Sequence, residues 1–147
     1  KLGKAFADSA PSSFGGLFGT ALMKGGMALK GKHAASLRDL ADASQAALDA
    51  LMERGKAQMG DKTMLDAIHP AIQAMRGVIA ETGEDAGLET FFSAAAEAAA
   101  QGAKATQSLT SKIGRASWQG DRSSGKMDPG AHAIALMLAA AARHSTG

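Results

Sequence analysis

The stretch LETFFSAAAEAAAQGAKATQSLTSKI, residues 88–113, decides the fold class of this sequence. Positions spaced alternately four and three residues apart form one series: Leu88, Phe92, Ala95, Ala99, Gly102, Thr106, Leu109 and Ile113. This spacing places the whole series on one face of an α-helix. Most residues in the middle of that face are small, so neighbouring helices can approach it closely. We therefore predict a long helix that packs through a seam of small residues.

Two segments before it also have helical patterns. Residues 16–29 are rich in glycine, which indicates close approach of either a second helix or a ligand. Residues 36–53 carry an apolar stripe and begin with Ser36, a good N-cap residue. Asp39 in the first turn favours the positive end of that helix.

Two further helices are predicted. Residues 61–80 have apolar side chains at three- and four-residue spacing, with Asp61 as the expected cap. Pro70 lies inside that pattern and predicts a kink or a break just before it. Residues 128–143 begin with Asp-Pro, an N-cap followed by a proline at the first helical position. No strand-like alternation of useful length is visible, so we expect an all-α fold, an antiparallel helical bundle or barrel.

Length and composition narrow the class of protein. The chain has 147 residues, 46% of them apolar, which fits one globular domain over residues 1–147. The formal charge of +2 is small and no basic patch is interleaved with aromatics, so we expect neither nucleic acid nor a membrane surface as partner. Cysteine is absent, which rules out disulfides and thiol nucleophiles.

No familiar catalytic motif is present. The four histidines are scattered and show no metal-ligand spacing, and neither a G-x-S-x-G elbow nor a complete phosphate-binding G-x-x-x-x-G-K-[ST] sequence occurs. Three polar, glycine-containing stretches stand out instead. The first, APSSFGGLFG at residues 10–19, precedes a helix whose free N–H groups could face an anion, or it is an ordinary cap followed by glycine packing.

The second polar stretch is RGKAQMGDKTMLD, residues 54–66. It is either a charged helix connector or a ligand loop in which Gly55 and Gly60 let the backbone turn sharply and Met64 supplies an apolar wall. The third is GRASWQGDRSSGKMDPGA, residues 114–131. Its arginines could hold phosphate oxygens bidentately. Trp118 could stack on a planar ligand or anchor the loop to the core. Together the three stretches favour a nucleotide or phosphate site at one end of a bundle.

Two longer motifs, RGKAQMGDKTMLDAIHPA at residues 54–71 and the third stretch at residues 114–131, resemble the nucleotide-binding DhaL subunit or domain of dihydroxyacetone kinases, as does LFGT at residues 17–20. The resemblance covers essentially the whole chain. It implies a barrel of eight antiparallel helices that holds ADP or ATP through two Mg²⁺ ions. It also implies phosphoryl transfer to dihydroxyacetone or a related short ketose, bound on a separate DhaK partner. A DhaM protein that rephosphorylates bound ADP, a homodimer and a cytoplasmic location are further expectations from the family.

The resemblance also implies nucleotide contacts at individual positions. Those expected are Ser12, Ser13, Phe14, Gly55, Met64, Arg115, Asp128, Pro129 and Gly130. The family usually has G-G-x-S-G before its LFGT-like run, whereas this chain has PSSFG, so Phe14 stands where a serine is expected.

The metal ligands of the family are not matched in these residues. The family coordinates Mg²⁺ through aspartates of a G-D-x-D-x-G-x-N-type motif near its N-terminus, and this sequence has no such motif. Asp61 and Asp66, five residues apart, do not share a helix face and are poor replacements. We therefore expect metal ligands upstream of Lys1, no catalytic residue in the chain itself, and no activity from these 147 residues alone. The alternative is a non-catalytic binding or regulatory module of the same helical fold.

Overall fold

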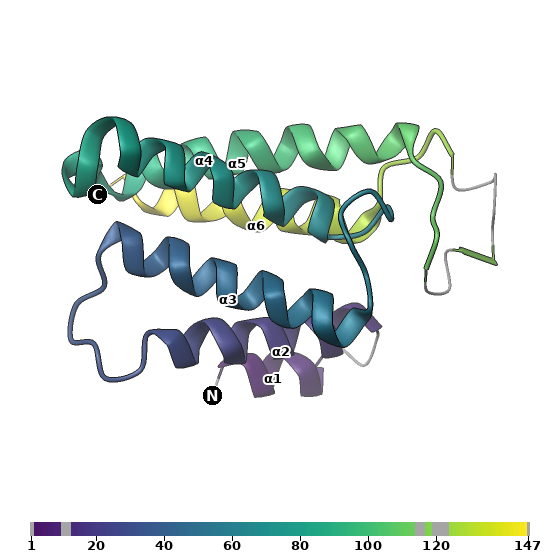
Figure 1. Ribbon diagram of the computed structural model, residues 1–147, viewed down its shortest axis with the longest axis horizontal. Helices are drawn as coiled ribbons and strands as arrows, with labels where there is room; N and C mark the ends of the chain where they lie inside the picture. The colour runs from purple at the N-terminus through teal and green to yellow at the C-terminus, as the bar shows by residue number, and fades with distance from the viewer. Residues whose placement is uncertain (1, 10–12, 114–116, 119–123, 147) are drawn as a thin grey trace. The chain divides into compact units, whose positions relative to one another are not determined.

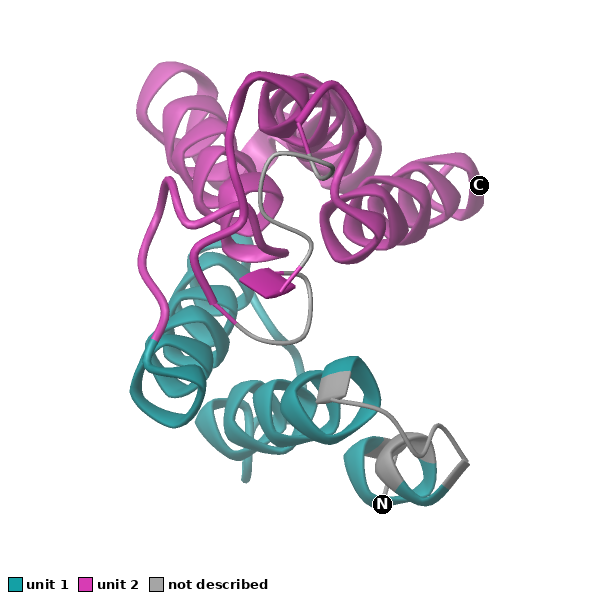
Figure 2. Ribbon diagram, turned by 90° about the vertical axis from the view of Figure 1, so that its right-hand side faces the viewer, with its two compact units in different colours: residues 1–56 teal, residues 57–147 magenta. Residues whose placement is uncertain are grey.

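The computed structural model describes residues 2–9, 13–113, 117–118 and 124–146, which form α-helices, short 3₁₀ helices and connecting segments. These residues contain no β-strand, so the prediction of an all-α fold is confirmed. The chain divides into two compact units, residues 1–56 and residues 57–147, shown in different colours in Figure 2. The assignment of all 147 residues to a single domain stays a prediction.

The first unit consists of α1 (Leu2–Ser9), α2 (Ser13–Ala28) and α3 (Leu37–Gly55), with α2 packed against both of the others. Close packing depends on glycine at Gly3 and Gly25. A Cβ atom on Gly3 would lie 2.7 Å from the Gly19 carbonyl oxygen, and one on Gly25 would lie 3.0 Å from the Ala43 carbonyl oxygen. Helix packing thus accounts for these glycines.

The start of α3 matches its prediction. The Ser36 hydroxyl accepts a hydrogen bond from the Asp39 amide (3.1 Å), and the Asp39 carboxylate accepts one from the Ser36 amide (3.0 Å). This reciprocal pair is a capping box, which satisfies two helix-end donors at once. The Lys32 ammonium lies 2.8 Å from the same carboxylate and lowers the pKa of Asp39, together with the Ser36 amide.

The second unit contains α4 (Leu65–Thr82), α5 (Gly87–Ala105) and α6 (Pro129–His144), with 3₁₀ helices η1 (Gly83–Ala86) and η2 (Thr106–Ser108) at the two ends of α5. Helix α5 packs against α4 and α6, and it runs antiparallel to both (Figure 1). The N-termini of α4 and α6 therefore lie at the same end of this unit as the C-terminus of α5. The core between the three helices is built mainly from alanines, with Ile72, Met75, Phe91 and Ile134 as its larger members.

Helices α4 and α5 approach most closely at Gly102. A Cβ atom on Gly102 would lie 2.2 Å from the Asp66 carbonyl oxygen and 2.8 Å from Cγ of Pro70. Pro70 has no N–H to donate to that carbonyl, the usual partner four residues away. The backbone of Gly102 therefore lies against this carbonyl, and the position leaves no room for a side chain.

The seam predicted along residues 88–113 is partly wrong. Phe91 is fully buried, whereas Leu88 is exposed. Helix α5 ends at Ala105 rather than at Ile113. The reason lies at Thr106, whose hydroxyl donates to the Ala103 carbonyl oxygen (2.5 Å) and so competes with helix continuation.

The start predicted for α4 is also wrong. The helix begins at Leu65 and not near Asp61, because Lys62 adopts a left-handed conformation (φ 62°) that no α-helix can include. Of the kink or break predicted before Pro70, the break does not occur, since α4 is one continuous helix, and the kink stays a prediction. Pro70 lies near the start of α4, so the carbonyl that it leaves without an N–H donor belongs to the first turn.

Candidate functional site

The polar end of the second unit is formed by three segments: residues 57–64 before α4, residues 106–113 after α5, and residues 124–128 before α6. We call these segments the polar end. All three are adjacent to the helix ends that meet there (Figure 1). They contain every buried polar or charged side chain among the described residues, namely Asp61, Lys62, Thr106 and Ser111.

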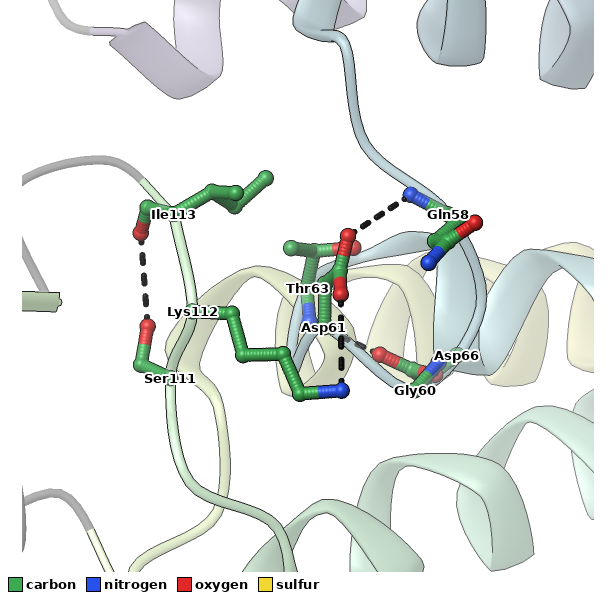
Figure 3. A network of polar contacts seen from close by, with 8 residues as sticks. All are labelled: Gln58, Gly60, Asp61, Thr63, Asp66, Ser111, Lys112 and Ile113. Atoms are coloured by element: carbon green, nitrogen blue, oxygen red, sulfur yellow. Dashed lines mark hydrogen bonds and ion pairs between the residues drawn. The ribbon is translucent and has the colours of Figure 1, made fainter.

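Two carboxylates organise the segment before α4 (Figure 3). Asp66 accepts hydrogen bonds from the amides of Gly60 (2.5 Å) and Thr63 (2.8 Å), one at each oxygen. Asp61 accepts from the Gln58 amide (2.9 Å), and its other oxygen lies 3.9 Å from the Lys112 ammonium. The left-handed φ of 89° at Gly60 forms part of this turn. The carboxylates thus hold the loop that leads into α4.

Lys62 links the other two segments of the polar end. Its side chain is buried, with the residue only 5% exposed. The ammonium donates to the carbonyl oxygens of Leu109 (2.9 Å) and Lys126 (2.7 Å). Burial of an ammonium is unfavourable unless hydrogen bonds compensate it, and these carbonyls supply such bonds.

Thr106 and Asp128 join the end of α5 to the start of α6. The Thr106 hydroxyl accepts a hydrogen bond from the Asp128 amide (2.8 Å), and the Gly125 amide donates to the Gln107 carbonyl oxygen (2.8 Å). The Asp128 carboxylate caps α6 by accepting from the Ala131 amide (2.8 Å). The predicted Asp-Pro start of α6 is therefore confirmed.

Burial raises the pKa of Asp128. Hydrogen bonds from the amides of Ala131 and Gly130 oppose this shift, as does the charge of Lys62, while the charge of Asp66 adds to it. The carboxylates of Asp128 and Asp66 and the ammonium of Lys62 are thus electrostatically coupled. The N-termini of α4 and α6 add positive partial charge at this end, whereas the C-terminus of α5 and the carboxylates of Asp61, Asp66 and Asp128 add negative charge.

The residues predicted to contact nucleotide divide between the two units. Asp128, Pro129 and Gly130 lie at the start of α6, and Met64 lies directly before α4 with its side chain buried. These four belong to the second unit.

The other predicted positions lie elsewhere. Ser13 is the first residue of α2 and Gly55 the last of α3, both in the first unit. Phe14 stacks on Phe18 of the same helix, with ring centroids 5.5 Å apart. The sharp turn expected at Gly55 is made instead by Lys56, whose φ is 47°. Ser12 and Arg115 lie outside the described residues.

Trp118 does not anchor its loop to the core. The side chain is 88% exposed, so the proposal that it packs inward is wrong. Stacking of Trp118 on a planar ligand stays a prediction.

The residues of the polar end do not fit a magnesium site. Both oxygens of Asp66 already accept backbone amides, and both oxygens of Asp61 have partners. Asp128 is committed to capping α6. Within the described part of the chain, no group of three or more histidine or acidic side chains could hold a metal ion.

Sequence reasoning missed the roles of Lys62 and Thr106. The sequence places Lys62 only in a charged connector or ligand loop, and Thr106 only on the face of a long helix. Nothing in the sequence around Lys62, three residues before the start of α4 at Leu65, indicates that its side chain is buried. Only the tertiary contacts reveal that each residue crosses between segments.

The sequence matches the family model of the DAK2 domain over residues 1–143. This chain belongs to the DAK2 domain family. The match extends over both compact units. The resemblance noted from the sequence motifs is thereby confirmed.

Several relatives are kinases or kinase subunits. An L-erythrulose 1-kinase of Mycolicibacterium smegmatis is 35% identical over 98% of this chain, which covers 24% of that relative. The ADP-binding subunit DhaL of a PEP-dependent dihydroxyacetone kinase of Escherichia coli is 30% identical over 92% of this chain and 63% of the relative. The chain thus spans less than two thirds of either protein.

A solved structure shares the fold. The dihydroxyacetone kinase of C. freundii aligns with 97% of this chain and 22% of its own, with a TM-score of 0.69 at 24% identity. Among the described residues, no helix is both long and apolar enough to cross a membrane.

Proposed function

We propose that this chain is part of the nucleotide-binding component of a kinase for dihydroxyacetone or a related short ketose. The observation that carries the proposal is the DAK2 match over residues 1–143. Relatives named as an ADP-binding subunit and as erythrulose kinases support both the nucleotide and the substrate class.

We propose that the start of α6 forms one part of the nucleotide site. Asp128, Pro129 and Gly130 form the turn expected to contact nucleotide, and α6 directs its positive N-terminal end there. Arg115, Ser12, Ser13, Phe14, Gly55 and Met64 complete the proposed set. A phosphate near α6 would gain from the positive helix end. It would compete with the Asp128 carboxylate for the amides of Gly130 and Ala131, which already donate to that carboxylate.

Phosphoryl transfer itself would need further components. A DhaK-type partner would hold the ketose, and a DhaM-type protein or ATP would supply the phosphoryl group. Mg²⁺ would neutralise charge on the phosphates. Because Asp61, Asp66 and Asp128 are engaged in backbone hydrogen bonds, the metal ligands would come from other residues. We propose that the 147 residues alone are inactive for this reason.

Calorimetric titration of the protein at its natural length with MgADP tests the proposal. Binding is expected, as is ketose phosphate formation when a DhaK-type partner and a phosphoryl donor are added. Arg115→Ala should weaken binding by about 1.5–3 kcal/mol, the range for hydrogen bonds to charged groups. Arg143→Ala, an exposed change in the last turn of α6, is the matched control and should leave affinity unchanged.

Absence of any MgADP binding would overturn the kinase proposal. Binding without phosphoryl transfer to either dihydroxyacetone or erythrulose would favour the alternative, a non-catalytic module of the same fold. An unchanged affinity in Arg115→Ala would remove that residue alone from the site.

A further inference from the structure

Lys62 differs from the other lysines near the polar end. Lys112 and Lys126 are exposed, whereas Lys62 is 5% exposed and its ammonium is enclosed by backbone carbonyls. Its left-handed φ of 62° is uncommon for a residue with a side chain. Such a conformation is unfavourable and persists only where the surrounding structure fixes it.

The two carbonyls bound by Lys62 come from segments far apart in sequence. Leu109 follows α5 and Lys126 precedes α6, and Lys62 itself precedes α4. One ammonium therefore ties together all three segments of the polar end. The only regular element in these three segments is the short helix η2 (Thr106–Ser108), and it does not connect them.

The hydrogen bonds next to this link lead directly to the start of α6. Beside Leu109, the Gln107 carbonyl accepts from the Gly125 amide, and Thr106 accepts from the Asp128 amide. The contacts form a short ladder between residues 106–109 and residues 125–128, with Lys62 across it. Loss of the ammonium would leave two carbonyls without this donor at the centre of the ladder.

We infer that Lys62 is a positioning residue that fixes the Asp128–Gly130 turn for nucleotide binding. The inference rests on the proposed function for its ligand. The inference assigns Lys62 no contact with nucleotide. The role of Lys62 is to hold the residues before α6 in the conformation that binds the nucleotide.

The variant Lys62→Met tests this role, because methionine keeps much of the apolar stem and removes the ammonium. Lys104→Met, an exposed change in the last turn of α5, is the matched control.

Two measurements are needed. Hydrogen exchange of the nucleotide-free protein should show faster exchange at the Gly125 and Asp128 amides in Lys62→Met, with the amides of Ala95 and Ala99 unchanged. MgADP affinity should fall by up to roughly 10- to 100-fold, because binding must then restore the turn that the lost charge-assisted hydrogen bonds no longer hold. Lys104→Met should match the wild type in both measurements.

Each contrary result has a distinct meaning. Wild-type exchange at Gly125 and Asp128, or wild-type ADP affinity, in Lys62→Met would overturn the inference. If Lys62→Met does not fold, Lys62→Gln must give the same two local changes; loss of protection throughout both variants would show a general structural role and also overturn it. If the wild type binds no MgADP, the proposed function fails, and local exchange in the free protein still decides whether Lys62 holds the turn.

Discussion

At the scale of single residues, the polar end uses its carboxylates to hold backbone. Asp66 receives amides from Gly60 and Thr63, and Asp128 receives the Ala131 amide. A carboxylate with both oxygens engaged by N–H groups gains charge-assisted hydrogen bonds at each. Asp66 is therefore a structural residue whose charge and two acceptors are both required.

Asp66→Asn is expected to destabilise the protein by about 1–3 kcal/mol. The amide side chain keeps one acceptor but turns an NH₂ group toward the other backbone N–H, which leaves that N–H without a partner. Equilibrium urea denaturation measures the change. Asp49→Asn, an exposed position whose carboxylate accepts only from Gln45 among the bonds seen, should change stability by less than about 0.5 kcal/mol. Equal effects at both positions would contradict the role of Asp66.

At the scale of helices, the close crossing of α4 and α5 requires glycine at position 102. Gly102→Ala would place a Cβ atom 2.2 Å from the Asp66 carbonyl oxygen, and backbone cannot move aside as a flexible side chain does. We expect destabilisation of about 1–3 kcal/mol, the usual range for overpacking, seen as a lower midpoint in thermal unfolding.

Gly77→Ala provides the control for this substitution. Gly77 lies in α4, and a Cβ atom there would meet nothing within 4 Å. Alanine should therefore stabilise the helix by about 0.5–1 kcal/mol through backbone entropy and propensity. Stabilisation by Gly102→Ala as well would show that the two helices separate readily at this crossing.

The capping box at the start of α3 gives another prediction for a single helix. Ser36→Ala removes the acceptor for the Asp39 amide and should destabilise the protein by about 1 kcal/mol. Ser36 is exposed, so lost burial does not contribute. Ser93→Ala, at an exposed position inside α5, should be neutral or slightly stabilising, since alanine is the better helix former. The two variants are compared by urea denaturation followed by circular dichroism, and similar effects would exclude a role for the cap.

At the scale of the whole molecule, the all-α class and most helices could be predicted from sequence. Helical spacing, the cap at Ser36 and the Asp-Pro start of α6 are local signals, and the structure confirms them. Helix ends without such signals were misplaced. The end of α5 depends on a hydroxyl bond at Thr106, and the start of α4 depends on the left-handed conformation of Lys62.

The polar end was harder to predict because its contacts join distant segments. Lys62 reaches Leu109 and Lys126, which lie 47 and 64 residues away in sequence. Residue spacing describes only neighbours within one element. It therefore indicates the glycine and aspartate positions, but not the buried Lys62 ammonium that binds the carbonyls of Leu109 and Lys126. A resemblance between motifs likewise marks expected ligand positions and not the residues that hold them in place.

The dependence of stability on pH has opposite contributions in the two units. In the first unit, the pKa of Asp39 is lowered from its ordinary value of 3.8 by Lys32 and by the Ser36 amide and hydroxyl. Ionised Asp39 therefore favours the folded state, fully above pH 3.8, and this contribution is lost as the pH falls through the lowered value. In the second unit, burial raises the pKa of Asp128 above 3.8. Its ionised form disfavours the folded state, and protonation relieves this as the pH falls toward 3.8.

Asp39→Asn and Asp128→Asn should therefore differ from the wild type in opposite ways as the pH is lowered. The destabilisation caused by Asp39→Asn should be full at neutral pH. It should shrink as the pH falls below 3.8, because the wild-type carboxyl is protonated first in the unfolded chain and then, below the lowered pKa, in the folded protein. The wild type should gain stability relative to Asp128→Asn between neutral pH and 3.8, because only the wild type has a carboxylate to protonate. Urea denaturation at several pH values gives both differences.

Added salt should weaken the effect at Asp39, which pairs with exposed Lys32, more than the effect at half-buried Asp128. Parallel pH curves for the two variants would contradict the assigned shifts.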